Sequence, residues 1–293
     1  RMNYERRTMT DQTRWGIELV QQKNKQKAFE QQMHIAERQN ITTTKRFYKS
    51  QYNIAIDLFL KNKQTQPSFI FKMSDFINLY KQLYRDVGMR FAKWYFRNSK
   101  ELLNKQLSIT DYEVFWEERF FYFGEQVAVA RALMVSNTAK KTFMRIANTF
   151  LSDPEFMMLG VPQQARILRK TFNHYSQFQA ERFVRTEATN AANFGTMQSA
   201  LSVFPGQEMK KEWIASFDDR TRDTHAEADG QVVNYNDPFF VGGYQMQYPG
   251  EPGAPSNEVI NCRCSVAPFP VDDASAIDDF ESIGFGMSGS SII

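Results

Sequence analysis

Two cysteines and one histidine in the C-terminal third of the chain have the residue types of a metal site. Cys262 and Cys264 are the only cysteines of the 293-residue chain, and His225 is one of its three histidines. We expect a strand over Cys262–Ala267, in which the two thiols project to the same face because side chains alternate. Thiolates and an imidazole are ligands that zinc prefers. These three residues therefore predict a structural zinc site.

The zinc interpretation has an alternative. The turn expected at Asp229-Gly230 brings His225 back toward the cysteines, and Asp218 or Asp223 is the candidate fourth ligand. A Cys-x-Cys pair, however, lacks the spacing of the usual zinc motifs. In the alternative interpretation no metal is bound: both thiols are small buried hydrophobic groups, and the histidine is a hydrogen-bonded structural residue. A disulfide between residues i and i+2 is strained, so we expect reduced cysteines and a reducing compartment.

Charged residues crowd the same region and allow two interpretations. Because Arg–carboxylate pairs are often bidentate and fix irregular loops, we predict a structural network and no catalytic residue. The alternative is a nucleotide-transfer or nuclease site that uses Arg185, Glu187 and His225, since ion-pair networks and active sites look alike in a sequence. No Gly-rich phosphate loop, H-E-x-x-H pattern or G-x-S-x-G elbow is present. The predicted network comprises Arg185, Glu187, Trp213, Asp218, Asp219, Arg220, Arg222, Asp229, Gly230, Asn261 and Arg263.

Long helical patterns precede these residues. From Asp11 to about Lys63 the chain is polar, lacks proline and has a narrow apolar stripe, which predicts a long helix that needs a partner. Ser74 is the expected N-cap of a strongly amphipathic helix. Thr110 and Glu113 have the spacing of a capping box, and the helix that follows is apolar on most sides, which predicts a central, buried helix. A shorter helix is expected over 138–151.

A further helical pattern begins at Pro162, and the hydrophobic period changes only beyond Gly206. This proline is typical of a first helical turn, and we expect helix from there to about Val203, split near His174–Ser176 and rich in small residues in its second half. The residues between Pro238 and Ser256 are expected to form a loop. Strands are predicted at Lys211–Phe217, Gln231–Tyr235 and Cys262–Ala267.

The predicted fold class is therefore α+β, with a mostly α-helical N-terminal region of long amphipathic helices followed by a small α+β module. The expected domains are a helical scaffold over residues 1–161, the module over 162–270, and an acidic Gly/Ser tail over 271–293. Residues 1–110 hold 21 lysines and arginines against 9 acidic residues. This excess of positive charge predicts contact with double-stranded DNA or an acidic surface. In the alternative interpretation, the basic residues only form the solvent-exposed face of long helices. We expect no signal peptide and no membrane contact.

Short motifs follow one another in a specific order between Gln163 and Pro268. They are R-T-E at Arg185–Glu187, a strand with Trp213, D-D-R-T-R-x-x-H at Asp218–His225, D-G-Q-V at Asp229–Val232, Y-P-G at Tyr248–Gly250 and N-C-R-C at Asn261–Cys264. This order resembles the Mu F-like, or SPP1-type, head-morphogenesis family of tailed bacteriophages.

The resemblance implies a structural minor head protein, present in multiple copies, that acts in head morphogenesis and DNA packaging. Its implied partners are the portal protein and other head proteins. It implies assembly in the host cytoplasm and a final place inside the capsid, at the portal vertex of the virion. Some relatives are fused to portal or toxin domains, so the alternative is a toxin-like or nucleic-acid-processing enzyme packaged with, or fused to, a phage head module.

Overall fold

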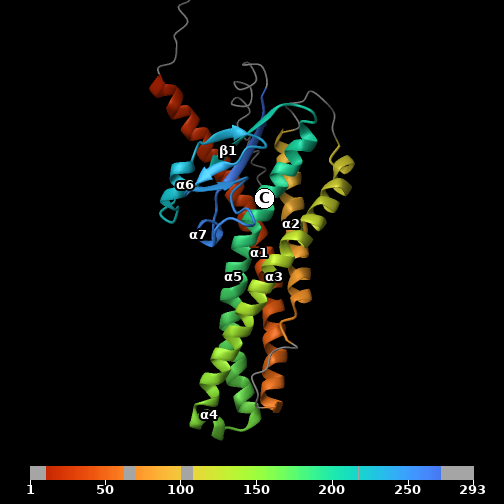
Figure 1. Ribbon diagram of the computed structural model, residues 1–293, viewed down its shortest axis with the longest axis vertical. Coiled ribbons are helices and arrows are strands. Elements are labelled where there is room, and N and C mark those ends of the chain that lie inside the picture. Colours follow the sequence, from red (N-terminus) through yellow and green to blue (C-terminus); the bar gives the residue numbers. More distant parts are fainter. Residues whose placement is uncertain (1–10, 63–69, 100–107, 217, 272–293) are drawn as a thin grey trace, which may run out of the picture.

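A computed structural model describes residues 11–62, 70–99, 108–216 and 218–271, with the backbone alone for residues 11–23. The acidic tail from residue 272 onward, the break expected at Pro67 and the end of the first predicted strand at Phe217 lie outside the described residues. The described part is an elongated helical bundle with a small mixed module against one end (Figure 1). The predicted α+β fold class is confirmed.

Four long helices and one short helix build the bundle. Its core is unusually aromatic, with Tyr52 stacked on Phe172 and Tyr80 edge-on to Phe183. In Figure 1 the short α4 lies at the end of the bundle opposite the module. The bundle helices are α1 (Asp11–Asn62), α2 (Met73–Ser99), α3 (Thr110–Leu151), α4 (Pro154–Met158) and α5 (Val161–Val203).

The starts of two helices differ from the prediction. Helix α2 begins at Met73, so Ser74 lies within its first turn and is not the N-cap. Helix α3 has Ile109 at the N-cap position, with no side-chain hydrogen bond, so the capping box expected from Thr110 to Glu113 does not form. The Glu113 carboxylate instead pairs with Lys93 of α2 at 2.8 Å. A tertiary ion pair therefore replaces the local cap.

Two predicted helix breaks are absent from the structure. Helix α3 continues through residue 138 to Leu151, and α5 continues through His174–Ser176. Neither point has a glycine or proline, and Ser176 satisfies its hydroxyl by donating to the Phe172 carbonyl at 2.8 Å. Polar residues at these points therefore do not interrupt the helices.

The prediction that α3 is central and buried is wrong. The helix lies at the side of the bundle against α2 (Figure 1). Its inner face buries Trp116 and Phe120, but Tyr122 is 62% exposed and Met134 is 68% exposed. The apolar residues of α3 therefore lie on two faces. Helices α2 and α5 cover one of these faces, and the other is exposed among the described residues.

The module contains a three-stranded antiparallel sheet with β1 at its centre, between β2 and β5. The expected loop after Pro238 contains a hairpin, because Gly242 and Gly243, with φ of +57° and +85°, allow a tight turn between two three-residue strands. The module elements are β1 (Met209–Ile214), α6 (Asp223–Ala228), β2 (Val232–Asn234), β3 (Phe239–Val241), β4 (Tyr244–Met246), α7 (Ser256–Val259) and β5 (Ser265–Pro270).

Helix α5 belongs to both the bundle and the module. A Cβ atom on Gly195 would lie 2.4 Å from the Gly88 carbonyl oxygen, so α5 and α2 approach each other closely at this point. On another side, Asn193 of α5 accepts from Val266 N of β5 at 2.9 Å. The small residues in the second half of α5 therefore allow both α2 and the module to pack closely against this helix. Within the described residues, none of the helices has the length and hydrophobicity of a transmembrane segment.

Candidate metal centre

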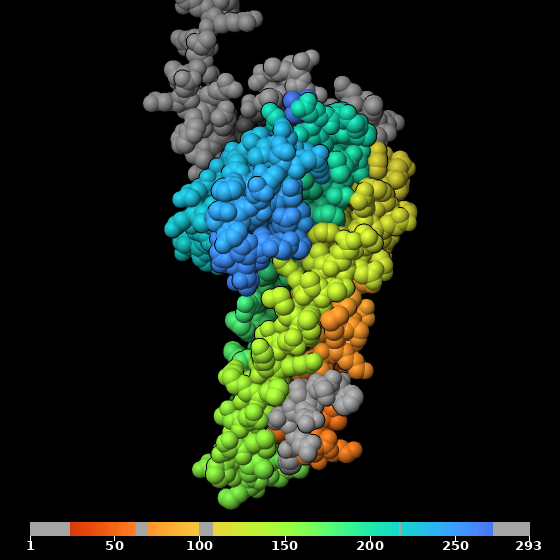
Figure 2. All heavy atoms as spheres, in the orientation of Figure 1, coloured from red at the N-terminus to blue at the C-terminus, as the bar shows by residue number. Residues whose placement is uncertain are grey.

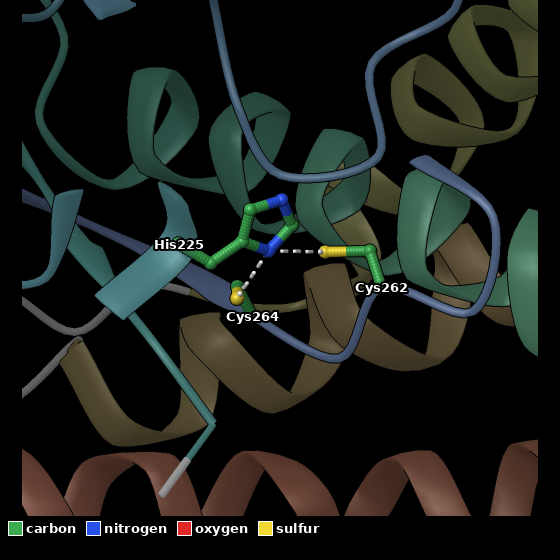
Figure 3. Close-up of side chains that lie close together, drawn as sticks. All are labelled: His225, Cys262 and Cys264. Atoms are coloured by element: carbon green, nitrogen blue, oxygen red, sulfur yellow. Dashed lines mark hydrogen bonds between the residues drawn. The ribbon is translucent and has the colours of Figure 1, made fainter. Parts of the chain in front are cut away.

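His225, Cys262 and Cys264 meet in the interior of the module, with both sulfur atoms facing the same ring nitrogen (Figure 3). Nδ1 of His225 lies 3.2 Å from Sγ of Cys264 and 3.8 Å from Sγ of Cys262. All three residues are buried, and their ligand atoms lie within 4.8 Å of one another. Tetrahedral zinc, with bonds of about 2.0–2.3 Å, holds its ligand atoms roughly 3.5–3.8 Å apart. The cluster can therefore bind a metal ion.

The cysteines reach this position by a route that differs from the predicted strand. Strand β5 begins only at Ser265, so Cys262 and Cys264 lie in the turn between α7 and β5. Asn261 has φ of +57°, which reverses the chain just before the first cysteine. Thr189 of α5 then donates to the Cys262 carbonyl at 2.6 Å. A left-handed residue and a helix side chain, and not strand alternation, bring the thiols together.

A buried carboxylate stands behind the histidine. Nε2 of His225 lies 3.1 Å from Oε2 of Glu258, although the ring N–H is not aligned for a hydrogen bond. Glu258 is itself held by Thr224 Oγ1 at 2.9 Å and by Asn257 Nδ2 at 2.7 Å. A carboxylate behind a ligating histidine is typical of metal sites. Glu258 was not identified from the sequence.

The two thiols have opposite electrostatic environments. The Cys264 thiol, together with the nearby guanidinium groups of Arg222 and Arg263, lowers the pKa of Cys262. The Cys262 sulfur and burial raise the pKa of Cys264 well above its usual range, although His225 opposes this. A metal ion binds cysteine in the thiolate form, so metal binding at this cluster would release thiol protons.

The expected fourth ligand does not join the cluster. Arg263 forms a bidentate ion pair with Asp218, with one contact at 2.7 Å from Nη2 to Oδ1. Its hydrogen bonds hold the pKa of Asp218 well below its usual range. Asp223 is exposed on α6. Among the described residues the metal-binding group contains only the histidine and the two cysteines.

Other residues of the predicted network make separate hydrogen bonds and packing contacts within the module. Arg222 donates to the Ile260 carbonyl, beside the cysteine turn. Asp229 accepts from Ala215 N at 2.7 Å, and Gly230, with φ of +73°, returns the chain to Trp213 by donating to its carbonyl at 2.9 Å. The buried Trp213 ring packs edge-on against the histidine of the cluster at 5.5 Å between centroids.

Glu187 belongs to a different buried group. It accepts from Arg131 of α3 at 2.7 Å and from the Tyr84 hydroxyl of α2 at 2.8 Å, so it joins three bundle helices. Burial opposes the charge on Arg131, but Glu187 raises the pKa of this guanidinium. The predicted residues thus lie in separate groups, with Glu187 apart from the Asp218–Arg263 pair.

The remaining network residues lie in different surroundings. Arg185 is half-buried, and its positive charge opposes the burial that raises the pKa of Glu37 in α1. Asn261 donates its backbone N–H to Thr186 Oγ1 at 3.2 Å. Arg220 is exposed and donates its backbone N–H to Asp218 at 3.0 Å. Asp219 is exposed, with no ion pair to a described residue.

Helix α1 also reaches the module, through two residues that the sequence did not single out. Gln26 donates to the Arg263 carbonyl at 2.9 Å and accepts from Ser265 Oγ at 2.7 Å. Glu30 accepts from Ser216 Oγ at 2.9 Å. The cysteine turn is therefore held from one side by α5 and from the other by α1.

Comparisons with known proteins agree with the resemblance and place its start earlier in the chain. Residues 126–267 match the family described as Phage Mu protein F like protein, so the match begins within α3, upstream of Gln163. No solved structure matches the chain.

Two curated proteins match parts of the chain. The minor head protein GP7 of Bacillus phage SPP1 is 31% identical over 108 residues, which are 36% of this chain and 34% of that protein. The NAD(+)–arginine ADP-ribosyltransferase EFV of Enterococcus faecalis (strain ATCC 700802 / V583) is 36% identical over 88 residues, which are 30% of this chain and 18% of that protein. The chain thus spans about a third or less of either relative. Residues 126–267 are a phage Mu protein F-like domain, distantly homologous to the SPP1 minor head protein.

Proposed function

We propose that this chain is a structural minor head protein of a tailed bacteriophage, which acts in head morphogenesis near the portal and stays inside the capsid. The observation that carries the proposal is the homology of its Mu F-like domain to a minor head protein. The site supports it because Glu187 is only 5% exposed and His225 only 2% exposed. Both residues are engaged within the fold, as structural residues are.

Deletion of the gene from the phage genome tests this role. We expect loss of infectious particles and the accumulation of empty or malformed heads, visible by negative-stain electron microscopy. A plasmid copy of the chain should restore the titre. Normal heads and an unchanged titre in the deletion strain would contradict the proposal.

We further propose that the histidine–cysteine cluster binds one zinc ion with a structural role. His225, Cys262 and Cys264 supply three donors, and a bound zinc would cross-link α6 to the turn before β5. Protein purified without chelators should contain about one zinc per chain by elemental analysis, and a Cys262→Ser/Cys264→Ser variant should contain none. Metal-free wild-type protein after expression in zinc-supplemented medium would contradict this site.

The proposed partners are the portal protein, other head proteins and packaged double-stranded DNA, with several copies of the chain in each particle. The DNA contact is supported by the net charge of residues 1–110, although Lys81, Arg85 and Lys93 of α2 are already paired with acids of α3. Binding through phosphate contacts should fall steeply as salt rises. Binding to the portal through apolar surface should persist in the same salt range.

A second candidate function comes from the other relative, whose name describes transfer of ADP-ribose from NAD⁺ to arginine. Incubation of the full chain with NAD⁺ and a small guanidine acceptor tests it, with Glu187→Gln as the comparison. Transfer by the wild-type chain, with loss in a Glu187→Gln variant that keeps its melting temperature, would favour the enzyme. No transfer, or equal transfer by both, leaves Glu187 a structural residue.

A further inference from the structure

Three buried polar residues of α5 lie along the side of the helix that meets the cysteines. Thr186, Thr189 and Asn193 are all buried, and their spacing of three and four residues places them on one helix face. Figure 2 shows the module, in cyan to blue, against the upper part of the bundle, beside α5 in green to teal. A bundle helix therefore presents a row of hydrogen-bonding groups to the proposed metal centre.

Both threonines bond to the backbone of the turn that carries the cysteines. Thr186 Oγ1 accepts from Asn261 N at 3.2 Å, and Thr189 Oγ1 donates to the Cys262 carbonyl at 2.6 Å. Thr189 Oγ1 also lies 3.2 Å from the Arg185 carbonyl of its own helix, but its contact with the cysteine is the shorter one. The two hydroxyl groups therefore hold the backbone at the first cysteine.

The side-chain amide of Asn193 holds the backbone around the second cysteine. Its Nδ2 donates to the Cys264 carbonyl at 3.1 Å and to the Pro249 carbonyl at 2.8 Å, and its Oδ1 accepts from Val266 N at 2.9 Å. A buried backbone group that loses its partner costs free energy. One residue of α5 therefore fixes the chain on both sides of Cys264 and joins it to the Tyr-Pro-Gly segment.

These contacts fix the turn and leave the sulfur atoms available to a metal ion. They engage only backbone N–H and C=O groups of the turn, so they do not compete with ligation by the thiols. Side chains outside the turn also donate to its neighbouring carbonyls, Arg222 to that of Ile260 and Gln26 to that of Arg263. The positions of the two thiols therefore depend on surrounding elements of the fold, with α5 contributing most of the contacts.

We propose that Thr186, Thr189 and Asn193 are positioning residues of the metal centre and couple metal binding to the contact between the module and the bundle. This inference rests on the zinc site proposed above. Groups that orient metal ligands change metal affinity by roughly 10–100-fold. Coupling between two equilibria is reciprocal, so a bound zinc ion also strengthens the contact of the turn with α5.

Exchange of Thr189 in the full chain tests the positioning role. Thr189→Val removes the hydroxyl and keeps the shape, so the zinc dissociation constant should rise by roughly tenfold or more. Thr189→Ser keeps the hydroxyl and should bind zinc with near wild-type affinity. Thr196→Val is the matched control, because Thr196 is buried on the same helix and its hydroxyl has no hydrogen-bond partner in the described part of the chain. Competition with a chromophoric chelator measures the affinities.

Melting temperatures with and without zinc separate positioning from a purely structural role. Loss of a buried hydrogen bond lowers stability in both cases. A purely structural Thr189 would leave the zinc-induced rise in melting temperature of Thr189→Val equal to that of the wild type, because stabilisation by a ligand depends on its affinity. If Thr189→Val does not fold, Thr186→Val with Thr186→Ser provides the same comparison at the neighbouring contact.

Hydrogen exchange followed by mass spectrometry tests the coupling. Zinc should slow exchange in the segment 261–266, whose Asn261 and Val266 amides bond to α5, and it should do so less in Thr189→Val. Equal zinc affinity in Thr189→Val and the wild type, an equal loss of affinity in Thr196→Val, or exchange in this segment that does not respond to zinc would overturn the inference. A wild-type chain that binds no zinc would contradict the metal site itself, and this inference with it.

Discussion

The imidazole of His225 lies between the cysteine thiols on its Nδ1 side and the Glu258 carboxylate on its Nε2 side. The cysteines and the histidine were predictable because both types are rare in this chain and their motifs lie close together. Glu258 was not predictable, because it is one of 33 acidic residues and only the return of α7 to α6 brings it to the imidazole. Arg131 was missed for the same reason, since its partner Glu187 is distant in sequence.

Glu258→Gln should weaken zinc binding by roughly 10–100-fold, the usual effect of losing a carboxylate behind a ligating histidine. Competition with a chromophoric chelator measures the affinity. Cobalt substitution should still show sulfur-to-metal charge-transfer bands, because the ligands themselves are retained. The exposed Glu227→Gln on the same helix as the histidine is the matched control. Equal zinc affinity in both variants would remove Glu258 from the site.

Lys211 of β1 is fully buried and donates to the Gln247 carbonyl at 2.9 Å and to its side-chain oxygen at 2.7 Å. Burial lowers the pKa of Lys211 from 10.5 to about 8, with Glu251 and Asp237 opposing. Between these two values the unfolded chain binds more protons than the folded chain. The contribution of this lysine to the free energy of unfolding therefore rises with pH in that window.

Comparison with Lys211→Met isolates this contribution. The free energy of unfolding of the wild type, relative to the variant, should increase from pH 8 to pH 10. Urea unfolding at constant ionic strength provides the measurement. Parallel pH profiles for the two proteins would show that the lysine keeps its ordinary pKa in the folded state.

At the scale of the elements, the long helices follow from periodicity and from the lack of glycine and proline. The exposure of α3 could not be predicted from its sequence, because an apolar face looks the same whether α2 or another molecule covers it. The hairpin of β3 and β4 was missed because three-residue strands inside a segment rich in Gly and Tyr give no periodic signal. In both cases the outcome depends on tertiary packing, which the local sequence pattern does not contain.

The contact between α5 and α2 depends on glycine at position 195. Gly195→Ala places a methyl group 2.4 Å from the Gly88 carbonyl oxygen, which requires the helices to separate. We expect a loss of about 1–3 kcal/mol in the free energy of unfolding, as for other overpacked positions. Asn173→Ala, at an exposed position on the same helix, should change stability little. Chemical denaturation of both variants checks this, and equal stabilities would contradict close packing at this crossing.

At the scale of the whole molecule, the bundle and the module share α5 and are joined again by Gln26 and Glu30 of α1. The family motifs predicted the module and its relatives, but they missed the part of the family match that lies in α3 and α4; α1 and α2 lie outside that match. The module boundary at residue 162 stays a prediction, because α5 packs against α1, α2 and β5 alike. Among the described residues, part of the apolar surface of α3 is exposed in this elongated bundle.

We expect this chain to be a component of the phage head. Quantitative mass spectrometry of purified, nuclease-treated virions, with cryo-electron microscopy of the portal vertex, tests this role. We expect a constant, low copy number in filled heads and density for a long helical bundle inside the capsid near the portal. Absence of the chain from purified particles, with the portal and capsid proteins present, would contradict it and favour the enzyme.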